Sequence, residues 1–231
     1  MNNYININKK NKYLWVIIVF VVLLVGGTLA TLVLDVFTVN DKYNTVTTCL
    51  KVDYDVTNDD GTMPITGTLF FSSSAKGGLS GKVSLKINDS CSVEGIGSLI
   101  LNVVGASSTL IQTVDAHCEN SKTLETLTDL KTSSSCISNA DNIWVTDGTA
   151  LKYAVFDTNE INDNVQPISV GYVNKTGSID IYNDFLVTRT NVNYYIYIWL
   201  DGNISDNSYA NLSFNGNVSA SVVQKPEYME P

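Results

Sequence analysis

The sequence is poor in the residues from which catalytic and metal sites are usually built. Its 231 residues include a single histidine, His117, and four cysteines without a CxxC pair. A tetrahedral zinc site therefore has almost no ligands available. HExxH and GxSxG motifs are also absent, so a Ser-His-Asp triad would have to use His117. We expect no metal, no cofactor and no catalytic residue.

Basic residues are scarce as well. The chain has 14 Lys and Arg against 23 Asp and Glu, and Lys9, Lys10 and Lys12 precede the first acidic residue, Asp35. The part after Leu34 thus has 11 basic and 23 acidic residues, a net charge of −12. Such a surface offers no basic stripe for a phosphate backbone, which excludes nucleic acid as an expected partner.

One long uncharged run stands out against this background. It extends over residues 13–34 (YLWVIIVFVVLLVGGTLATLVL) and ends at Asp35. An apolar helix of about 20 residues spans the hydrocarbon layer, and basic residues remain on the cytoplasmic side. We therefore predict a cytoplasmic basic tail over 1–12 and a transmembrane signal anchor over 13–35. Lys9, Lys10 and Lys12 set the topology, so the C-terminal part lies outside the cell membrane.

The alternative for this run is a cleaved signal peptide, because Thr28-Leu29-Ala30 offers small residues at the spacing that signal peptidase prefers. Cleavage there would secrete the protein. The apolar run continues to Leu34, however, and exceeds the roughly 7 to 15 residues of a signal-peptide core. The length favours the retained anchor, and the rest of the chain is extracytoplasmic in either case.

All four cysteines lie in this outer part, where oxidation persists and an even number indicates disulfides. Among the possible connectivities we favour Cys49 with Cys91 and Cys118 with Cys136, because each pair joins neighbours in the sequence. The alternative is that some thiols stay free and fill space in the core.

Alternation of apolar and polar residues dominates the outer chain. It is clear over 46–56, 82–88 and 212–222, and such strands with one wet face are typical of antiparallel sheets. Other runs are apolar on both faces and predict central strands: residues 99–104, 151–156 and 194–200. With turn residues between them, these runs predict an antiparallel, jelly-roll-like β-sandwich over 45–223. Residues 36–44 are expected to form a juxtamembrane linker and 224–231 a flexible tail.

Three local patterns add detail. Leu124, Leu127 and Leu130 recur every third residue, which predicts one short helix. Asn215-Gly216 lies within an alternating run whose even-numbered apolar face continues past it, which predicts a strand with a bulge or a close approach of another group. The acidic cluster from Asp53 to Asp60 has the composition of a calcium loop but not the EF-hand spacing, so a solvated turn is favoured.

Several segments resemble a group of small, N-terminally anchored surface proteins of Firmicutes and related bacteria. They are TTCLKVDYDVTN from Thr47, INDSC from Ile87, LKYAVFD from Leu151, GYVNKTGSIDIYNDF from Gly171, and YYIYIWLDGNISDN with LSFNGNVSASV near the C-terminus. These proteins are mostly uncharacterised, and their ectodomains resemble the β-sandwich of TasA and camelysin. The resemblance implies a biofilm-matrix-like role. The camelysin group is classed as a metallopeptidase, but this chain lacks a histidine pair to hold a metal.

The expected function is therefore that of a membrane-anchored bacterial surface protein with a structural, adhesive or biofilm-matrix-like role. Its expected partners are the membrane, through one helix, and itself or other surface proteins. A module that binds a ligand or a protein through its loops is the first alternative. An extracellular hydrolase is less favoured, because a catalytic carboxylate pair has no sequence spacing that would identify it.

Overall fold

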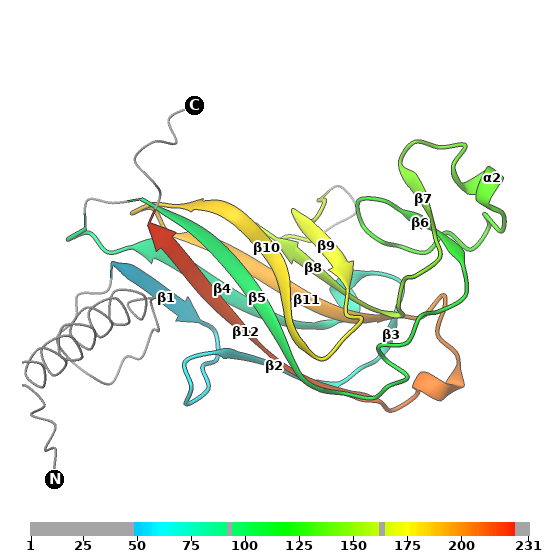
Figure 1. Ribbon diagram of the computed structural model, residues 1–231, viewed down its shortest axis with the longest axis horizontal. Helices are drawn as coiled ribbons and strands as arrows, with labels where there is room; N and C mark the ends of the chain where they lie inside the picture. Colours follow the sequence, from blue (N-terminus) through cyan, green and yellow to red (C-terminus); the bar gives the residue numbers. More distant parts are fainter. Residues whose placement is uncertain (1–48, 92–93, 162–164, 225–231) are drawn as a thin grey trace, which may run out of the picture. The chain divides into compact units, whose positions relative to one another are not determined.

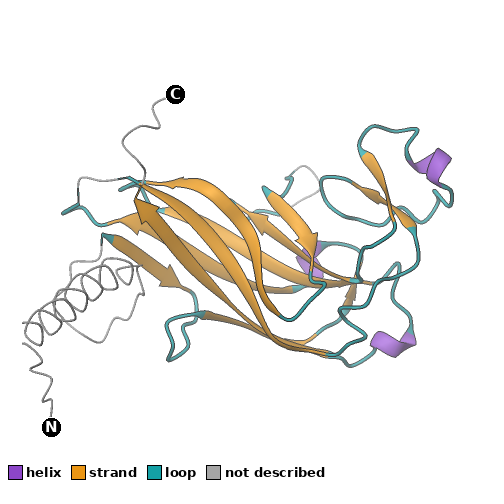
Figure 2. Cartoon of the chain, in the orientation of Figure 1, coloured by secondary structure: helices purple, strands orange, loops and turns teal. Residues whose placement is uncertain are grey.

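The computed structural model describes residues 49–91, 94–161 and 165–224, in which β-strands are the main regular structure and are joined by loops and short helical turns (Figures 1 and 2). The strands are β1 (Leu50–Tyr54), β2 (Met63–Thr68), β3 (Phe71–Ser72), β4 (Leu79–Ile87), β5 (Gly95–Ala106), β6 (His117–Asn120), β7 (Asn142–Val145), β8 (Leu151–Phe156), β9 (Ser169–Tyr172), β10 (Gly177–Val187), β11 (Val192–Asp201) and β12 (Ser213–Gln224). The helical elements are α2 (Ser133–Cys136) and two short 3-10 turns, η1 (Ala75–Gly77) and η2 (Asn207–Tyr209).

Most strands belong to two antiparallel sheets. Sheet A has the order β1-β4-β11-β8-β9, and the short β3 also pairs with β11, in parallel. Sheet B has the order β10-β5-β12-β2, and β6 pairs with β7 in a separate two-stranded sheet. Because consecutive strands repeatedly cross from one large sheet to the other, the eight strands β2, β4, β5 and β8 to β12 have jelly-roll connectivity. The predicted mainly β, antiparallel fold is confirmed.

Sheets A and B face each other across the main core. Tyr54 of β1 accepts a hydrogen bond from the backbone N–H of Ala220 in β12, at 3.1 Å. Tyr194 of β11 lies against Phe185 of β10, with 4.8 Å between the ring centroids. The fully buried aliphatic and aromatic side chains of alternate positions fill this core: Val83, Leu85, Leu99, Leu101, Leu151, Val155, Ile196, Ile198, Phe214 and Val218. The period-two pattern of the sequence thus marks the inner faces correctly.

A second, smaller core covers the opposite face of sheet A. It contains Ala154 and Phe156 of β8 and Trp199 of β11, together with Ala75 of η1 and Leu124. Leu124 belongs to a long excursion, residues 107–149, which leaves sheet B after β5 and contains β6, β7 and α2. All six residues of β8 are buried, because this strand has packed material on both faces.

The predicted helix is misplaced. Residues 124–130 do not form a helix: Leu124 has a left-handed backbone (φ 55°), and Thr126 forms a β-bridge with Glu119. The helix lies just after this segment, where Thr132 caps α2 by accepting a hydrogen bond from the backbone N–H of Ser135. A three-residue leucine spacing is too short a pattern to outweigh these tertiary contacts. By contrast, the predicted bulge at Asn215-Gly216 is confirmed by a register shift there between β12 and β5.

The structure contains the two favoured disulfides. Cys49 pairs with Cys91 at the start of β1, and Cys118 of β6 pairs with Cys136 of α2. The first bridge fastens the edge strand β1 beside the end of β4, and the second closes a loop inside the excursion. None of the helices in 49–91, 94–161 and 165–224 is long and apolar enough to cross a bilayer. The predicted anchor over 13–35, with Lys9, Lys10 and Lys12, lies outside the described residues, as do the whole predicted linker over 36–44 and residues 225–231 of the predicted tail over 224–231. Gln224, the first residue of that tail, is the last residue of β12.

Candidate functional site

Three ionisable side chains meet on the covered outer face of sheet A. Lys152 of β8 stands opposite Trp199 of β11, so Asp201, two residues further along β11, lies diagonally across from it on the same face. Glu119 reaches this face from β6 of the excursion. Lys152, Asp201 and Glu119 have 0 % exposed surface. We call these three residues the charge cluster.

The ammonium of Lys152 is fully hydrogen-bonded. Its Nζ lies 2.5 Å from Oδ2 of Asp201 and 2.7 Å from Oε1 of Glu119, and it donates to the carbonyl oxygen of Leu124 at 2.7 Å. An ammonium has three protons to donate, and each has an acceptor here. A buried charge is tolerated only with such pairing, because its removal from water costs several kcal/mol per ion.

Both carboxylates have additional donors. Oδ1 of Asp201 accepts from the backbone N–H of Asn203 at 2.9 Å, and Oδ2 accepts from the hydroxyl of Thr126 at 2.7 Å. Oε2 of Glu119 accepts from the hydroxyl of Tyr172 in β9 at 2.5 Å. The cluster therefore joins β8, β11 and the excursion, and its bond with Tyr172 adds β9.

His117 completes the cluster at its outer side. Its Nε2 lies 2.6 Å from Oε1 of Glu119, and its Nδ1 lies 2.7 Å from the carbonyl oxygen of Asp115. The carbonyl oxygen of Asp115 and an ionised Glu119 are acceptors only, so each needs a donor from the ring, whereas a neutral imidazole has only one N–H. The geometry therefore favours the doubly protonated ring. With His117 charged, two cations balance the two carboxylates.

The pKa directions agree with this geometry. Burial lowers the pKa of His117, but the hydrogen bonds to Glu119 and to the Asp115 carbonyl raise it, and the net pKa is above the ordinary value. Burial raises the pKa of Glu119, but the contacts with His117 and Lys152 outweigh it, and the net pKa is lowered. Burial, together with the bond to Glu119, raises the pKa of the Tyr172 phenol, so it remains a donor at neutral pH.

The charge cluster was missed by the sequence analysis, although one signal for it exists. Residues 151–156 were recognised as apolar on both faces, and that run contains Lys152. A lysine in a strand that is buried on both faces requires a partner. The sequence does not identify the partners, because Glu119 and Asp201 reach Lys152 only through the tertiary fold. His117 was noted as a lone histidine, and the structure places it beside Glu119.

The acidic segment from Asp53 to Asp60 begins in the last two residues of β1 and continues into a solvated turn. Asp53 pairs with Lys51 at 3.2 Å, and Oδ1 of Asp60 accepts from the backbone N–H and the hydroxyl of Thr62 at 3.0 and 2.6 Å. These side chains do not converge on a common centre. Within the part of the chain that the structure describes, no group of three or more His, Cys, Asp and Glu has an arrangement able to hold a metal ion.

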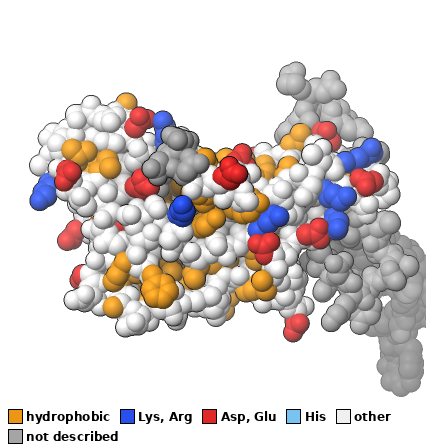
Figure 3. Space-filling model, turned by 180° about the vertical axis from the view of Figure 1, so that it is seen from behind, with side chains coloured by type: hydrophobic (Ala, Val, Ile, Leu, Met, Phe, Trp, Pro, Cys, Tyr) orange, Lys and Arg blue, Asp and Glu red, His pale blue; other side chains and the backbone are white. Residues whose placement is uncertain are grey.

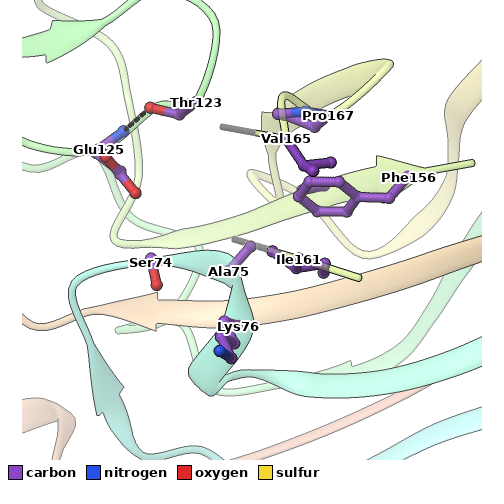
Figure 4. A pocket seen from close by; sticks show the side chains of 10 residues that line it. Ser74, Ala75, Lys76, Thr123, Glu125, Phe156, Ile161, Val165 and Pro167 are labelled. Atoms are coloured by element: carbon purple, nitrogen blue, oxygen red, sulfur yellow. Dashed lines mark hydrogen bonds between the residues drawn. The ribbon is translucent and has the colours of Figure 1, made fainter. Parts of the chain in front are cut away.

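Two clefts lie near the excursion. The first is a cleft of about 200 Å³ over β8 with a mixed lining: Phe156 lies beside Val165 and Pro167, and polar residues such as Lys76 and Glu125 also line it (Figure 4). It is smaller than the roughly 300 to 1,000 Å³ of typical small-molecule sites. The second cleft, of about 410 Å³, is lined by polar residues that include Gln112, Asp115 and His117. The charge cluster itself is closed to solvent.

Comparisons of the chain with protein-family models, with curated proteins and with solved structures find no match. Function must therefore be argued from the chemistry of the residues themselves.

Replacement of Lys152 by methionine tests the role of the cluster. The change keeps the volume but leaves two buried carboxylates without their shared cation, so we expect the free energy of unfolding to fall by about 3 to 5 kcal/mol. The control is Lys122→Met, because Lys122 pairs with Asp141 at 2.9 Å on the surface. Exposed pairs contribute about 0 to 1 kcal/mol. Denaturant unfolding under oxidising conditions measures both, and equal losses in the two variants would contradict the assignment.

The protonated ring of His117 predicts a pH dependence. Its folded pKa lies above the ordinary value of 6.5, so its contribution to stability is complete below about pH 6.5 and is lost as the pH rises through the raised pKa. The lowered pKa of Glu119 adds a second loss, on the acid side of its ordinary value of 4.5. In His117→Gln, which keeps one donor but does not titrate, the alkaline decline in the free energy of unfolding should disappear and the acid decline should remain.

Proposed function

We propose that the chain is a single-pass membrane protein of a bacterial cell surface whose outer β-sandwich has a structural or adhesive role. The two disulfides support an extracytoplasmic location, because such bonds persist in oxidising compartments. The apolar run with its preceding lysines supports the anchor. The resemblance to anchored Firmicutes surface proteins with a TasA- or camelysin-like ectodomain supports the assignment to the cell surface.

The observation that carries this proposal is the complete burial of the charge cluster. Lys152, Glu119 and Asp201 have the side-chain chemistry of an acid–base site, but all three have 0 % exposed surface and are occupied with one another. A substrate has no access to them, whereas the excursion depends on them for its attachment to sheet A. The arrangement suits a durable building block, and in this proposal the protein is not an enzyme.

The exposed surface offers apolar side chains for contact with other molecules. Phe70 and Phe71, between β2 and η1, are 74 % and 47 % exposed. Figure 3 shows hydrophobic side chains exposed among interspersed acidic and basic ones on one face, without a continuous basic stripe. Adjacent exposed aromatic residues are unusual on a monomer and favour a contact surface. We therefore assign the aromatic pair, Phe70 and Phe71, to adhesion or assembly.

Three of the four edge strands of sheets A and B are less suited to this contact. β2 carries Pro64, β1 presents the charged Lys51 and Asp53, and β10 is interrupted by register shifts near Asp184, whose backbone is left-handed (φ 59°). Proline, charge and bulges all oppose pairing with another strand. Contact through side chains such as the aromatic pair is consequently favoured over addition of a strand to an edge.

A binding module remains the second candidate, because of the polar cleft beside His117. Its volume, about 410 Å³, falls within the range of ligand sites, and Gln112 and Tyr209 line it together with the acidic Asp115 and Asp206. These groups suit a polar or cationic ligand rather than an anion. Saturable binding of such a ligand that is lost in Asp206→Asn would favour this second function over the structural one.

The retained anchor predicts the result of protease shaving. Treatment of intact cells should digest the outer domain and leave a short membrane fragment that contains residues 13–35. Mass spectrometry of the membrane fraction identifies the fragment. A mature chain that begins at Thr31 and accumulates in the medium would instead establish cleavage of a signal peptide.

The structural role predicts salt-dependent self-association of the outer fragment, residues 41–231. Its surface is strongly acidic, since the chain after Leu34 has a net charge of −12, and repulsion opposes contact at low salt. Screening reduces the range of this repulsion from about 30 Å at 0.01 M to about 8 Å at physiological ionic strength. Light scattering should therefore show association that increases with salt.

The aromatic pair supplies the matched variants for this experiment. Replacement of Phe70 and Phe71 by serine should abolish the association, whereas serine at Val56, a separate residue that is 61 % exposed, should leave it intact. A wild-type fragment that stays monomeric at high concentration in every salt would contradict a role in self-assembly.

A further inference from the structure

The contact between Lys152 and Asp201 places a primary amine against a carboxyl group in a site without solvent. Nζ lies 2.5 Å from Oδ2, and both side chains have 0 % exposed surface. Glu119 lies on the same amine, with Oε1 2.7 Å from Nζ. We propose that Lys152 and Asp201 condense to an intramolecular amide that links β8 covalently to β11, with Glu119 as the group that accepts and returns the proton. This inference does not rest on the proposed function.

The close contact between Nζ of Lys152 and Oδ2 of Asp201 provides a path to the reactive forms of both groups. An ammonium and a carboxylate in a low-dielectric site are destabilised relative to water, and proton transfer from Nζ to Oδ2 produces a neutral amine and a neutral carboxylic acid. The neutral amine is the nucleophile, and the neutral acid is the better electrophile. The short contact between Nζ and Oδ2 lies along the path of this transfer. In a solvated pair this proton transfer has no driving force, because water stabilises both charges.

The surroundings of Asp201 polarise its carboxyl group. The backbone N–H of Asn203 donates to Oδ1 at 2.9 Å, where negative charge develops when an amine adds to Cγ. The hydroxyl of Thr126 donates to Oδ2 at 2.7 Å, which suits Oδ2 as the oxygen that leaves. Donors fixed in advance stabilise the tetrahedral intermediate without reorganisation.

The step balances without any added reactant. The lone pair of Nζ forms a bond with Cγ of Asp201, and the bond between Cγ and Oδ2 breaks. Of the protons of the original ammonium, one stays on the amide nitrogen. A second reaches Oδ2 directly, and the last passes through Oε1 of Glu119 to the departing oxygen, which leaves as water. No bond is oxidised or reduced, and Glu119 ends in its starting state.

His117 has a positioning role in this scheme. Its ring holds Oε1 of Glu119 at 2.6 Å, on the oxygen that also contacts Nζ. The hydroxyl of Tyr172 fixes the other oxygen of Glu119. The relay carboxylate is thus held in one orientation beside the amine, and orientation of reacting groups supplies much of the rate of such intramolecular reactions.

The molecule contains its own control for proximity alone. Lys122 and Asp141 lie 2.9 Å apart, but both side chains are about half exposed. Among the ion pairs of the described residues, no second carboxylate contacts Lys122 to act as a proton relay. Both side chains are also accessible to solvent. We expect it to remain a salt bridge, so that the same preparation should contain one linked pair and one unlinked pair.

The test is the mass of the full-length chain, purified in detergent, then reduced and alkylated to remove the contribution of the disulfides. The expected mass is lower than that of the fully reduced and alkylated sequence by one water molecule, and a protease digest should yield one branched peptide that joins Lys152 to Asp201. Lys122 and Asp141 should appear in unbranched peptides. A chain at the full sequence mass, with Lys152 and Asp201 in separate linear peptides, would overturn the proposal.

Two variants test the chemistry. Lys152→Arg keeps the cation but replaces the nucleophile, so the mass deficit of one water molecule should disappear. Glu119→Gln keeps the reacting pair but removes the relay, so the linked fraction should fall sharply. Lys122→Arg is the control and should keep the wild-type mass deficit. Recovery of the Cys118–Cys136 disulfide in a non-reducing digest verifies that each variant has folded. A deficit that persists in Lys152→Arg places the lost water elsewhere and refutes the link.

Discussion

A lysine without access to water is the constraint on which this structure depends. Lys152 lies in a strand whose residues are all buried, and its ammonium must therefore find acceptors inside the protein. It finds them on three segments: Asp201 on the neighbouring strand of sheet A, Glu119 on β6, and the carbonyl of Leu124. Removal of any one partner leaves a buried charge or donor unsatisfied. The excursion is held on sheet A by this requirement together with apolar packing.

The excursion contains two kinds of fastening that act at different places. The Cys118–Cys136 disulfide closes a loop within the excursion, whereas Glu119, next to Cys118, links β6 to β8 and β9 through Lys152 and Tyr172. The disulfide restricts the chain locally and the cluster attaches it to the sandwich. Both restrict the motion of the excursion, and both agree with the structural role proposed above. The low exposure of the cluster and the exposed aromatic pair agree with a role based on surface contact.

Much of the fold could be predicted because strand patterns are local. Alternation over 212–222 and the two-sided apolar run over 151–156 correspond to β12 and β8, and the bulge follows from Asn215-Gly216. The cluster could not be predicted in the same way, since its members come from distant parts of the sequence and have no periodic spacing. Lys152 is the one member that the sequence could have indicated, because it is a charged residue within a strand predicted to be buried on both faces. The helix predicted from the leucine spacing at 124–130 is wrong for a related reason. The carbonyl of Leu124 accepts a hydrogen bond from Lys152, and the hydroxyl of Thr126 donates one to Asp201.

The charge cluster holds the excursion on the sandwich through the contacts of Lys152 with Glu119 and Asp201. Amide hydrogen exchange tests it most directly, because the N–H groups of Leu127 and Asn120 donate within the excursion to the carbonyls of Cys118 and Glu125, whereas β5 and β12 lie in sheet B. In Glu119→Gln, we expect faster exchange at Leu127 and Asn120 and unchanged protection in β5 and β12. Unchanged protection throughout, or an equal loss in both regions, would contradict a local fastening role.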